Sequence, residues 1–254
     1  MKDSQAYQDK KALFDQMITV YGRNVVMEML NDETVHFHKI HLSKSNRQEG
    51  VVLEILALAK QRAIEVKLQS KEQLSRISKN SKQDQGVAAD IMASNYLDEK
   101  EIGNTLPEGY RLLALEGIQN PQNLGMIIRS AAAGNIDGII LPKDNSAKLS
   151  PLVIKASAGT LFKINIFYTK TLSPVLDRLS NEGAEIYALS SHAKEDIYTV
   201  TTGKKSVFVL GNESEGVSSE VEKQCNTSVS IPMQRGVESL NVAVTAALIA
   251  FMGK

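Results

Sequence analysis

Two glycines with acidic residues between them mark the stretch of this sequence where chemistry is most expected. Gly211 and Gly216 follow an apolar run, and Glu213 and Glu215 lie between them. Glycines at the end of a strand allow a ligand to approach the backbone amides closely. Carboxylates repel a pyrophosphate, so this loop, which also contains Asn212, is expected to bind a neutral or cationic ligand.

A second polar loop lies between an apolar segment and the last helix of the chain. Ile231 and Met233 precede it, and Ser239 and Asn241 are polar positions at its end. The structural interpretation of Ser239 is the N-cap of the following helix, in which Asn241 would then be a poor helix former. The residues alone leave open whether these side chains also bind a ligand.

A third pair of candidates, Asn123 and Arg129, stands on a segment with helical composition. Their spacing of six residues corresponds to about 9 Å along a helix axis. Arg129 follows Ile127 and Ile128 and precedes three alanines, where burying a guanidinium would cost free energy unless it served a purpose. Both a functional role and a structural ion pair, for example with Glu213, are consistent with this pattern.

Alternating strands and helices must position these candidates. We expect strands over residues 111–115, 137–141, 163–168, 184–189, 206–210 and 229–231, and helices over 124–133, 151–159, 173–181, 218–225 and 242–252. Strict alternation predicts an α/β fold in which a parallel sheet is flanked by helices on both faces. Ligands of such sheets bind at the carboxyl ends of the strands, where the polar loops begin.

A dinucleotide, the usual ligand of such a sheet, is not supported by the sequence. No G-x-G-x-x-G follows the first strand of the larger domain, and no G-x-x-x-x-G-K-[ST] pattern is present. A nucleotide-dependent oxidoreductase is therefore disfavoured.

The first part of the chain predicts a separate, small α/β module. Helices are expected over 25–32, 51–62 and 71–79, and strands over 37–42, 64–68 and from residue 86. Between Lys39 and Lys82 there are ten Lys or Arg and four Glu, although Lys+Arg and Asp+Glu are both 29 in the whole chain. Such a local excess is either a solvated face or a phosphate-binding patch. His36, His38 and His41 are interpreted as ordinary strand residues, because no cysteine or acidic cluster accompanies them to form a metal site.

The composition divides the chain into an extension, two domains and a linker. We expect an N-terminal extension over 1–19, the small domain over 20–93, a polar linker with Gly103 and Pro107 over 94–108, and the larger domain over 109–254. Cys225 is the single cysteine, which excludes an intrachain disulfide and fits a reducing cytoplasm. The N-terminus lacks an apolar signal core and the 242–252 helix is too short for a bilayer, so no membrane association is expected.

Three segments, in this order, resemble the three motifs of the SpoU/TrmH group of SPOUT RNA 2′-O-methyltransferases. The matching residues are Asn123, Gly125, Arg129, Ser130 and Ala131, then Leu210, Gly211, Asn212, Glu213 and Gly216, then Ile231, Pro232, Met233, Ser239, Leu240, Asn241 and Val242. Lys143–Asp144 and Ser157–Gly159 are also typical of the group. The small domain, with Tyr21–Gly22 at its start and 85–88 at its end, is similar to the group's RNA substrate-binding domain, so the resemblance covers about residues 20–252.

The resemblance implies a C-terminal trefoil knot, a homodimer with the apolar final helix in or near its interface, and S-adenosylmethionine as the methyl donor. It implies that the cofactor is bound by Leu210, Gly211, Asn212, Glu213, Gly216, Ile231, Met233, Ser239 and Leu240. Catalysis is assigned to Arg129, Asn123, Glu213, Ser239 and Asn241, with no metal ion.

The resemblance also implies roles for the catalytic residues. Arg129 is expected to orient the RNA and stabilise the developing oxyanion, since a guanidinium is not deprotonated in proteins. Asn123 and Asn241 would position Arg129 or the ribose, and Glu213 would hold Arg129 or face the cofactor. Ser239 would hold its loop or contact the substrate.

The implied reaction is methylation of a ribose 2′-hydroxyl in RNA, with a guanosine in 23S rRNA as the favoured target. A tRNA substrate is the alternative, but tRNA enzymes of the group usually carry basic extensions, whereas residues 1–19 contain three Lys and three Asp. A non-catalytic RNA-binding protein of the same fold is disfavoured by the full set of catalytic candidates. Arg235 and Glu238 depart from the group's pattern before Ser239 and are candidates for adjusting substrate choice.

Overall fold

The computed structural model of the chain describes residues 17–33, 35–79, 83–93 and 95–252. Two compact units are present, one made of Met1–Ser94 and Leu149–Pro151 and the other of Asn95–Lys148 and Leu152–Lys254. Residues 1–16 of the predicted extension lie outside the described residues. Residues 17–19, which were expected to belong to that extension, begin the first strand of the first unit.

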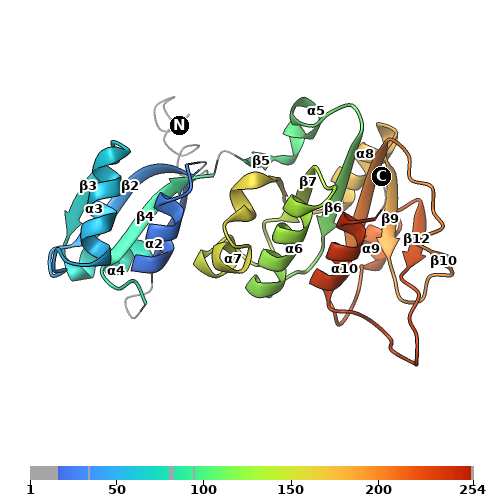
Figure 1. Cartoon of the computed structure of the whole chain (residues 1–254). Helices are drawn as coiled ribbons and strands as arrows, with labels where there is room; N and C mark the ends of the chain where they lie inside the picture. The colour runs from blue at the N-terminus through green and yellow to red at the C-terminus, as the bar shows by residue number, and fades with distance from the viewer. Residues whose placement is uncertain (1–16, 34, 80–82, 94, 253–254) are drawn as a thin grey trace, which may run out of the picture. The chain divides into compact units, whose positions relative to one another are not determined.

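The first unit is a four-stranded sheet with three helices, drawn in blue to teal in Figure 1. Its elements are β1 (Met17–Tyr21), α2 (Arg23–Leu30), β2 (His36–Ser43), α3 (Val51–Gln61), β3 (Val66–Gln69), α4 (Lys71–Ser78) and β4 (Val87–Met92). The strand order is β1-β4-β2-β3, antiparallel except for the parallel pair of β2 and β3. The predicted small α/β module is therefore present as its own unit, with β1 as a strand that the sequence pattern did not reveal.

A chain of polar side chains crosses this sheet from one edge to the other. Thr19 on β1 donates to Asp90 on β4 at 2.7 Å, and Nε2 of His41 on β2 lies 2.8 Å from the other Asp90 oxygen. Gln69 on β3 contacts Nδ1 of His41 at 3.3 Å. Burial tends to raise the pKa of Asp90, but the hydrogen bonds from His41 and Thr19 outweigh it and the pKa lies below its usual value.

The three histidines of β2 differ in exposure as the strand period predicts. His41 is buried, whereas His36 and His38 are exposed. Within the described ranges, no group of three or more His, Cys, Asp or Glu side chains has an arrangement that holds a metal ion. The buried histidine belongs to the polar chain across the sheet.

The second unit contains one eight-stranded parallel sheet in the order β10-β12-β9-β11-β6-β7-β8-β5. The strands are β5 (Tyr96–Asp98), β6 (Tyr110–Leu115), β7 (Gly138–Pro142), β8 (Asn165–Thr169), β9 (Glu185–Leu189), β10 (Glu195–Asp196), β11 (Lys205–Leu210) and β12 (Thr227–Ser230). The helices are η1 (Glu99–Glu101), α5 (Ile102–Thr105), α6 (Pro121–Ala133), α7 (Pro151–Ala156), η2 (Thr160–Lys163), α8 (Ser173–Asn181), α9 (Ser219–Glu222) and α10 (Val242–Ala250). The predicted parallel sheet flanked by helices is confirmed.

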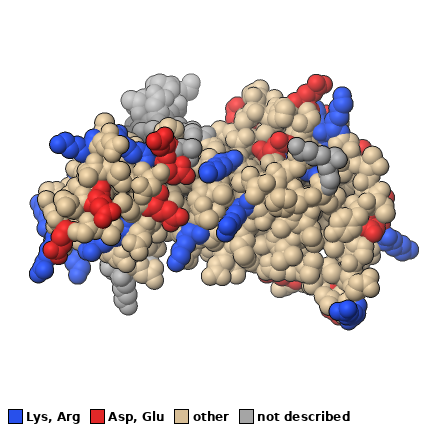
Figure 2. Space-filling view, viewed as in Figure 1, with Lys and Arg blue, Asp and Glu red and all other residues tan. Residues whose placement is uncertain are grey.

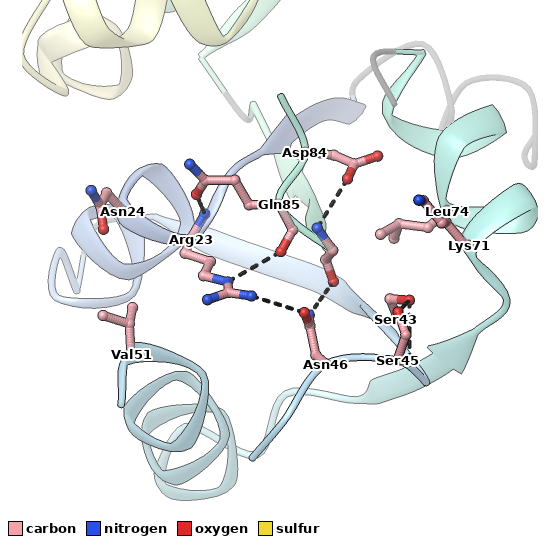
Figure 3. A pocket seen from close by; sticks show the side chains of 11 residues that line it. Arg23, Asn24, Ser43, Ser45, Asn46, Val51, Lys71, Leu74, Asp84 and Gln85 are labelled. Carbon is pink, nitrogen blue, oxygen red and sulfur yellow. Dashed lines mark hydrogen bonds between the residues drawn. The ribbon is translucent and has the colours of Figure 1, made fainter. Parts of the chain in front are cut away.

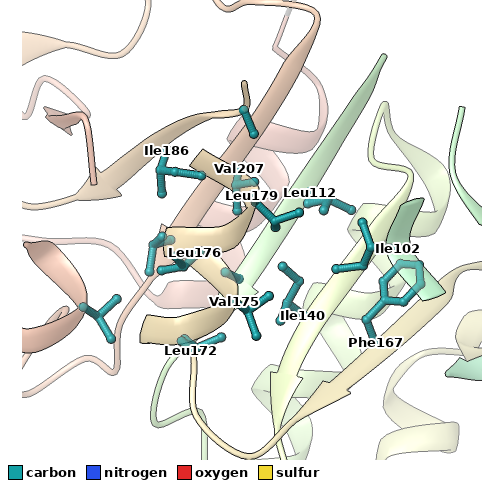
Figure 4. Packing of buried hydrophobic residues seen from close by; sticks show 14 of the residues in the cluster. Ile102, Leu112, Ile140, Phe167, Leu172, Val175, Leu176, Leu179, Ile186 and Val207 are labelled. Atoms are coloured by element: carbon teal, nitrogen blue, oxygen red, sulfur yellow. The ribbon is translucent and has the colours of Figure 1, made fainter. Parts of the chain in front are cut away.

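Helices cover both faces of this sheet because alternate strand residues point to opposite sides. On one face, Leu112, Ile140 and Val207 pack against Leu176 and Leu179 of α8 in a buried apolar cluster (Figure 4). On the other face, α6 and α10 lie side by side and contact β7 and β11 (Figure 1). Burial of this aliphatic surface is the main favourable term that holds the unit together.

Of the segment predicted as an interdomain linker, residues 94–108, residues 95–108 are instead part of the second unit. β5 pairs in parallel with β8 at the edge of the sheet, and Ile102 of α5 is buried in the apolar cluster. Glu99 forms an ion pair with Arg178 of α8, whose Nη2 also donates to the Glu99 carbonyl at 3.0 Å. The segment was predicted as a linker because it contains many acidic residues. Its short strand is defined by pairing with β8, which is distant in the sequence, rather than by a local pattern.

The last helix is shorter than predicted and ends at Ala250. None of the helices in the described part of the chain has the length and apolar character to cross a membrane.

Candidate functional site

A cavity of about 360 Å³ lies in the second unit, at the carboxyl ends of β9, β11 and β12 and at the start of α10. This volume is in the usual range of small-molecule sites. All nine predicted cofactor residues line it, namely Leu210, Gly211, Asn212, Glu213, Gly216, Ile231, Met233, Ser239 and Leu240. The structure thus brings together two loops that are about twenty residues apart in the sequence.

The loop after β11 is a tight turn that depends on Gly211. A Cβ atom at Gly211 would lie 1.9 Å from the backbone carbon and oxygen of Gly216, so no other residue fits without moving the backbone. The Asn212 side chain accepts hydrogen bonds from the N–H groups of Ser214 at 2.9 Å and Glu215 at 2.7 Å. The turn therefore presents a fixed, closely approachable backbone to the cavity.

The charge of the cavity is negative. Of the described residues, its lining contains four carboxylates, Glu213, Glu215, Glu222 and Glu238, one histidine, His192, and no Lys or Arg. Carboxylates in a concave site favour a cationic ligand and disfavour a phosphate. Leu210, Ile231, Met233, Leu240 and Val242 provide apolar surface beside this charge.

Three of the predicted catalytic residues form one hydrogen-bonded group at the edge of this cavity. One oxygen of Glu213, Oε1, accepts from Nδ2 of Asn123 at 2.7 Å and from Nδ2 of Asn241 at 2.8 Å. Nδ2 of Asn241 also lies 3.2 Å from Oδ1 of Asn123. Asn123 is buried, so the two amides hold a carboxylate that the cavity exposes. The expectation that Asn123 and Asn241 position Arg129 is not met in this arrangement, because their amides are bonded to Glu213.

Asn241, not Ser239, caps the last helix. Oδ1 of Asn241 accepts from the N–H of Ala243 at 2.9 Å, which leaves its Nδ2 for Glu213 and Asn123. The prediction erred by two residues because Ser and Asn are both favoured N-caps and both precede the apolar run. Ser239 is exposed and lines the cavity instead.

Arg129 is an exposed residue of α6 and does not line the cavity. It shares the exposed stripe of the helix with Gln122 and Met126, whereas Asn123, Ile127 and Ile128 face inward. The assumption that Arg129 is buried among apolar residues is therefore wrong. No hydrogen bond or ion pair of Arg129 occurs among the described residues, so the ion pair with Glu213 that was considered is absent.

Several residues of the cavity were missed by the sequence analysis. Leu189, Ser190, Ser191 and His192 follow β9, and Thr245 lies on the first turn of α10. The first four could have been predicted, because they lie at the carboxyl end of β9, the strand next to β11. Cys225, by contrast, is half-buried, and burial raises the pKa of its thiol to about 12, which disfavours the reactive thiolate.

Comparison with known proteins assigns this chain to one class, the RNA ribose methyltransferases. The SpoU rRNA Methylase family matches residues 110–251, and a family described as RNA 2′-O ribose methyltransferase substrate binding matches residues 19–97. Since the first match covers more than half of the chain, this chain belongs to the SpoU rRNA Methylase family. The predicted class of enzyme is confirmed.

Individual relatives cover nearly the whole chain. The 23S rRNA (guanosine-2′-O-)-methyltransferase RlmB of Xylella fastidiosa is 29 % identical over 235 residues, with 91 % of this chain and 94 % of that protein covered. A protein of Staphylococcus saprophyticus, provisionally named a TrmH family tRNA/rRNA methyltransferase, is 31 % identical, with 92 % and 94 % covered. Among solved structures, the SpoU methyltransferase AviRb of Streptomyces viridochromogenes in complex with AdoMet has a TM-score of 0.69 at 19 % identity, covering 98 % of this chain and 97 % of that one. This last likeness concerns the fold alone.

Proposed function

We propose that this protein transfers a methyl group from S-adenosylmethionine to a ribose 2′-hydroxyl of RNA, and that the target is a guanosine of 23S rRNA. The observation that carries the proposal is the acidic cavity formed by the residues of the second and third motifs. The enzyme class follows from the family. The 23S rRNA target is supported by the relative from Xylella fastidiosa, whose similarity extends over both units.

The cavity fits the chemistry of S-adenosylmethionine. This cofactor supplies an electrophilic methyl group on a positively charged sulfur and also carries an ammonium group. Glu213 and the neighbouring carboxylates match these positive charges, while Leu210, Ile231 and Met233 provide an apolar surface for the adenine ring. The backbone of the Gly211–Gly216 turn offers donors and acceptors at close range.

Different residues of the chain act on the cofactor and on the RNA. Asn123 and Asn241 hold Glu213 in one orientation, which fixes the negative charge of the cavity. Arg129 orients the RNA and stabilises the developing oxyanion, a role supported by its exposure and by the absence of a carboxylate partner among the described residues. A guanidinium does not accept a proton, so the hydroxyl proton goes to an RNA phosphate or to water. No metal ion takes part in the proposed mechanism.

A tRNA substrate is the second candidate. It is supported by the tRNA/rRNA description of the Staphylococcus saprophyticus relative. The first unit does not separate the two candidates, because both relatives cover more than nine tenths of this chain. The rRNA target is common to both descriptions, whereas tRNA stands in one alone.

We also propose a trefoil knot in the second unit, a homodimer and a cytoplasmic location. The knot is supported by the likeness to the AviRb fold over nearly the whole chain. The homodimer is supported by an exposed apolar surface on α10 and its neighbourhood, which includes Val244, Phe251 and Tyr198. The location follows from a ribosomal RNA substrate.

The proposed function is tested by mapping ribose methylation in RNA from cells with and without the gene. The proposal predicts the loss of one 2′-O-methylguanosine from 23S rRNA and its return when the gene is restored. Loss of a methyl group from a tRNA alone would support the second candidate, and an unchanged map of both RNAs would contradict the proposal.

A further inference from the structure

The first unit contains a cavity of its own, of about 650 Å³ (Figure 3). Its walls are the starts of α2, α3 and α4, the loop after β2 and the turn before β4. The cofactor cavity shares no residue with it. It is large enough for a nucleotide, and the proposed reaction does not yet use it.

Arg23 is the central cation of this cavity and is held rigidly. Its Nε donates to the Gln85 carbonyl at 3.1 Å and its Nη2 to Oδ1 of Asn46 at 3.0 Å. Asn46 in turn donates from Nδ2 to the Gly86 carbonyl at 2.7 Å. Among the described residues Arg23 has no carboxylate partner and Nη1 forms no hydrogen bond, so a pre-oriented guanidinium edge remains for a ligand.

The turn before β4 is built to keep this arrangement. Gly86 has a φ of 77°, and a Cβ atom there would lie 2.6 Å from the amide of Asn46. Asp84, the one acidic residue of the lining, is buried and already bonded, because its two oxygens accept from the Gly86 N–H and from Ser78, each at 2.9 Å. The negative charge of Asp84 is therefore stabilised by hydrogen bonds at the turn.

The remaining charge of the cavity is positive. Lys71 is exposed and belongs to none of the ion pairs formed among the described residues. The helices α2, α3 and α4 all begin at the cavity wall. The N-cap of α3, Gly50, provides no side-chain hydrogen bond, whereas the first N–H of α2, that of Arg23, donates to Oε1 of Gln85 at 3.0 Å, and Ser70 caps α4. Partial positive charge at these helix starts adds to the two cations.

We propose that this cavity binds a phosphodiester of the RNA substrate together with its nucleotide. This inference rests on the proposed function. Arg23 and Lys71 hold the phosphate, while Asn24 and Ser45 offer polar groups to the ribose or the base. None of the described residues that line the cavity is aromatic, so recognition is by charge and hydrogen bonds rather than by base stacking. The match of residues 19–97 to a substrate-binding family independently points to RNA as the ligand of this unit.

A cavity, rather than a broad basic face, is the more specific explanation of RNA binding by the first unit. Lys and Arg are interspersed with Asp and Glu on the face of the molecule seen in Figure 2. Some of the basic residues between Lys39 and Lys82 are paired or structural, since Lys39 pairs with Glu65 at 3.1 Å and Arg62 donates to backbone carbonyls. Lys71 is not used in this way, and Arg23 donates to one backbone carbonyl and to Asn46 but keeps Nη1 without a hydrogen bond among the described residues.

The test compares full-length variants in their affinity for a 23S rRNA transcript at several KCl concentrations. Lys71→Ala is expected to weaken binding roughly fivefold and to lower the slope of log K against log salt by about 0.7 to 0.9, the loss of one phosphate contact. Asn24→Asp places a carboxylate in the first turn of α2, where it favours the helix, so thermal stability is retained while RNA affinity falls. Lys60→Ala is the matched control, because Lys60 is equally exposed but lies in the last turn of α3, away from the cavity.

The outcomes separate this inference from the proposed function. Weaker RNA binding by both cavity variants, with thermal stability retained and with the control unchanged, supports the inference. Equal affinities for all variants, or equal losses in Lys71→Ala and Lys60→Ala, contradict it. If inorganic phosphate stabilises the wild type but not Lys71→Ala while RNA affinity is equal in both, the cavity binds free phosphate and the RNA assignment is overturned. A wild-type protein that methylates no RNA contradicts the proposed function, whereas the binding comparison still decides the inference.

Discussion

At the scale of single residues, Glu213 has two roles in the cofactor cavity. Its carboxylate is negative and faces the cavity, and it is also the shared acceptor of Asn123 and Asn241. These two roles can be separated by substitution, because a glutamine at this position keeps an acceptor oxygen but loses the charge.

We expect Glu213→Gln to weaken S-adenosylmethionine binding roughly fivefold, about 1 kcal/mol, with little change in thermal stability. S-adenosylhomocysteine, whose sulfur is neutral, is expected to lose less affinity than the cofactor. Isothermal titration calorimetry with both ligands measures the difference. Equal losses for the two ligands would show that Glu213 does not act on the sulfonium charge.

The residues of the site were predictable to different degrees. Gly211, Glu213 and Met233 could be assigned to one cavity, because strand ends of a parallel sheet meet at one edge. The exposure of Arg129 could not, since isoleucines and alanines surround it in sequence while the helix period places it on the outer stripe. The contact of Asn241 with Asn123, 118 residues away in the chain, follows from the tertiary structure alone.

At the scale of elements, the chain of Thr19, Asp90, His41 and Gln69 ties together all four strands of the first sheet. Because the pKa of Asp90 is lowered in the folded state, the folded protein binds fewer protons than the unfolded one near that pKa. The stability that ionised Asp90 contributes is thus present above about pH 4, the unfolded value, and is lost as the pH falls through the folded value.

Asp90→Asn is expected to lower the free energy of unfolding at pH 6 by about 1 to 3 kcal/mol, because a partly buried, charged hydrogen-bond acceptor is replaced. The variant should also lose less stability than the wild type between pH 6 and pH 3. Urea denaturation at the two pH values measures both effects. Parallel losses in the two proteins would rule out a contribution of Asp90 to the acid dependence.

Elements with strong local signals were predicted well and those defined by pairing were not. α6 has the Asn120–Pro121 start, and β11 has an uninterrupted apolar run, so both were found close to their observed bounds. β5 and β10 have three and two residues, and only their registers with β8 and β12 make them strands. β1 was missed because its partner, β4, is some seventy residues away in the chain.

At the scale of the whole molecule, the apolar surface around α10 favours an interface with a partner. Phe251 is 65 % exposed and Val244 is 47 % exposed, and both line a shallow cavity of about 500 Å³. Isolated exposed side chains need no explanation, but neighbouring ones on an uncharged helix favour an interface.

We expect Val244→Asp to convert the proposed dimer to a monomer, because the new carboxylate would be desolvated in the interface. Light scattering during size-exclusion chromatography measures the mass. Leu53→Asp on α3, where the leucine is 54 % exposed, is the control and should leave the mass unchanged. A wild type that already runs as a monomer would contradict the dimer.

The two-unit organisation and the end of the first unit near residue 94 could be predicted from the sequence, whereas the place of residues 95–108 in the second unit could not. The polar residues near Gly103 resemble a linker, yet the buried Ile102 and the edge strand β5 assign the segment to the second unit. A knot is a property of the path of the whole chain, so the prediction of one rests on the resemblance rather than on any local pattern.

The central claim is that the acidic cavity binds the methyl donor while Arg129 acts on the RNA. It is tested most directly by measuring both activities in one variant, Arg129→Ala, against the wild type. The account predicts that calorimetry gives S-adenosylmethionine affinity within about twofold of the wild type, whereas transfer of labelled methyl to a 23S rRNA transcript falls by about 100-fold or more. Near-normal methyl transfer by Arg129→Ala, or a loss of cofactor binding that matches the loss of transfer, would contradict it.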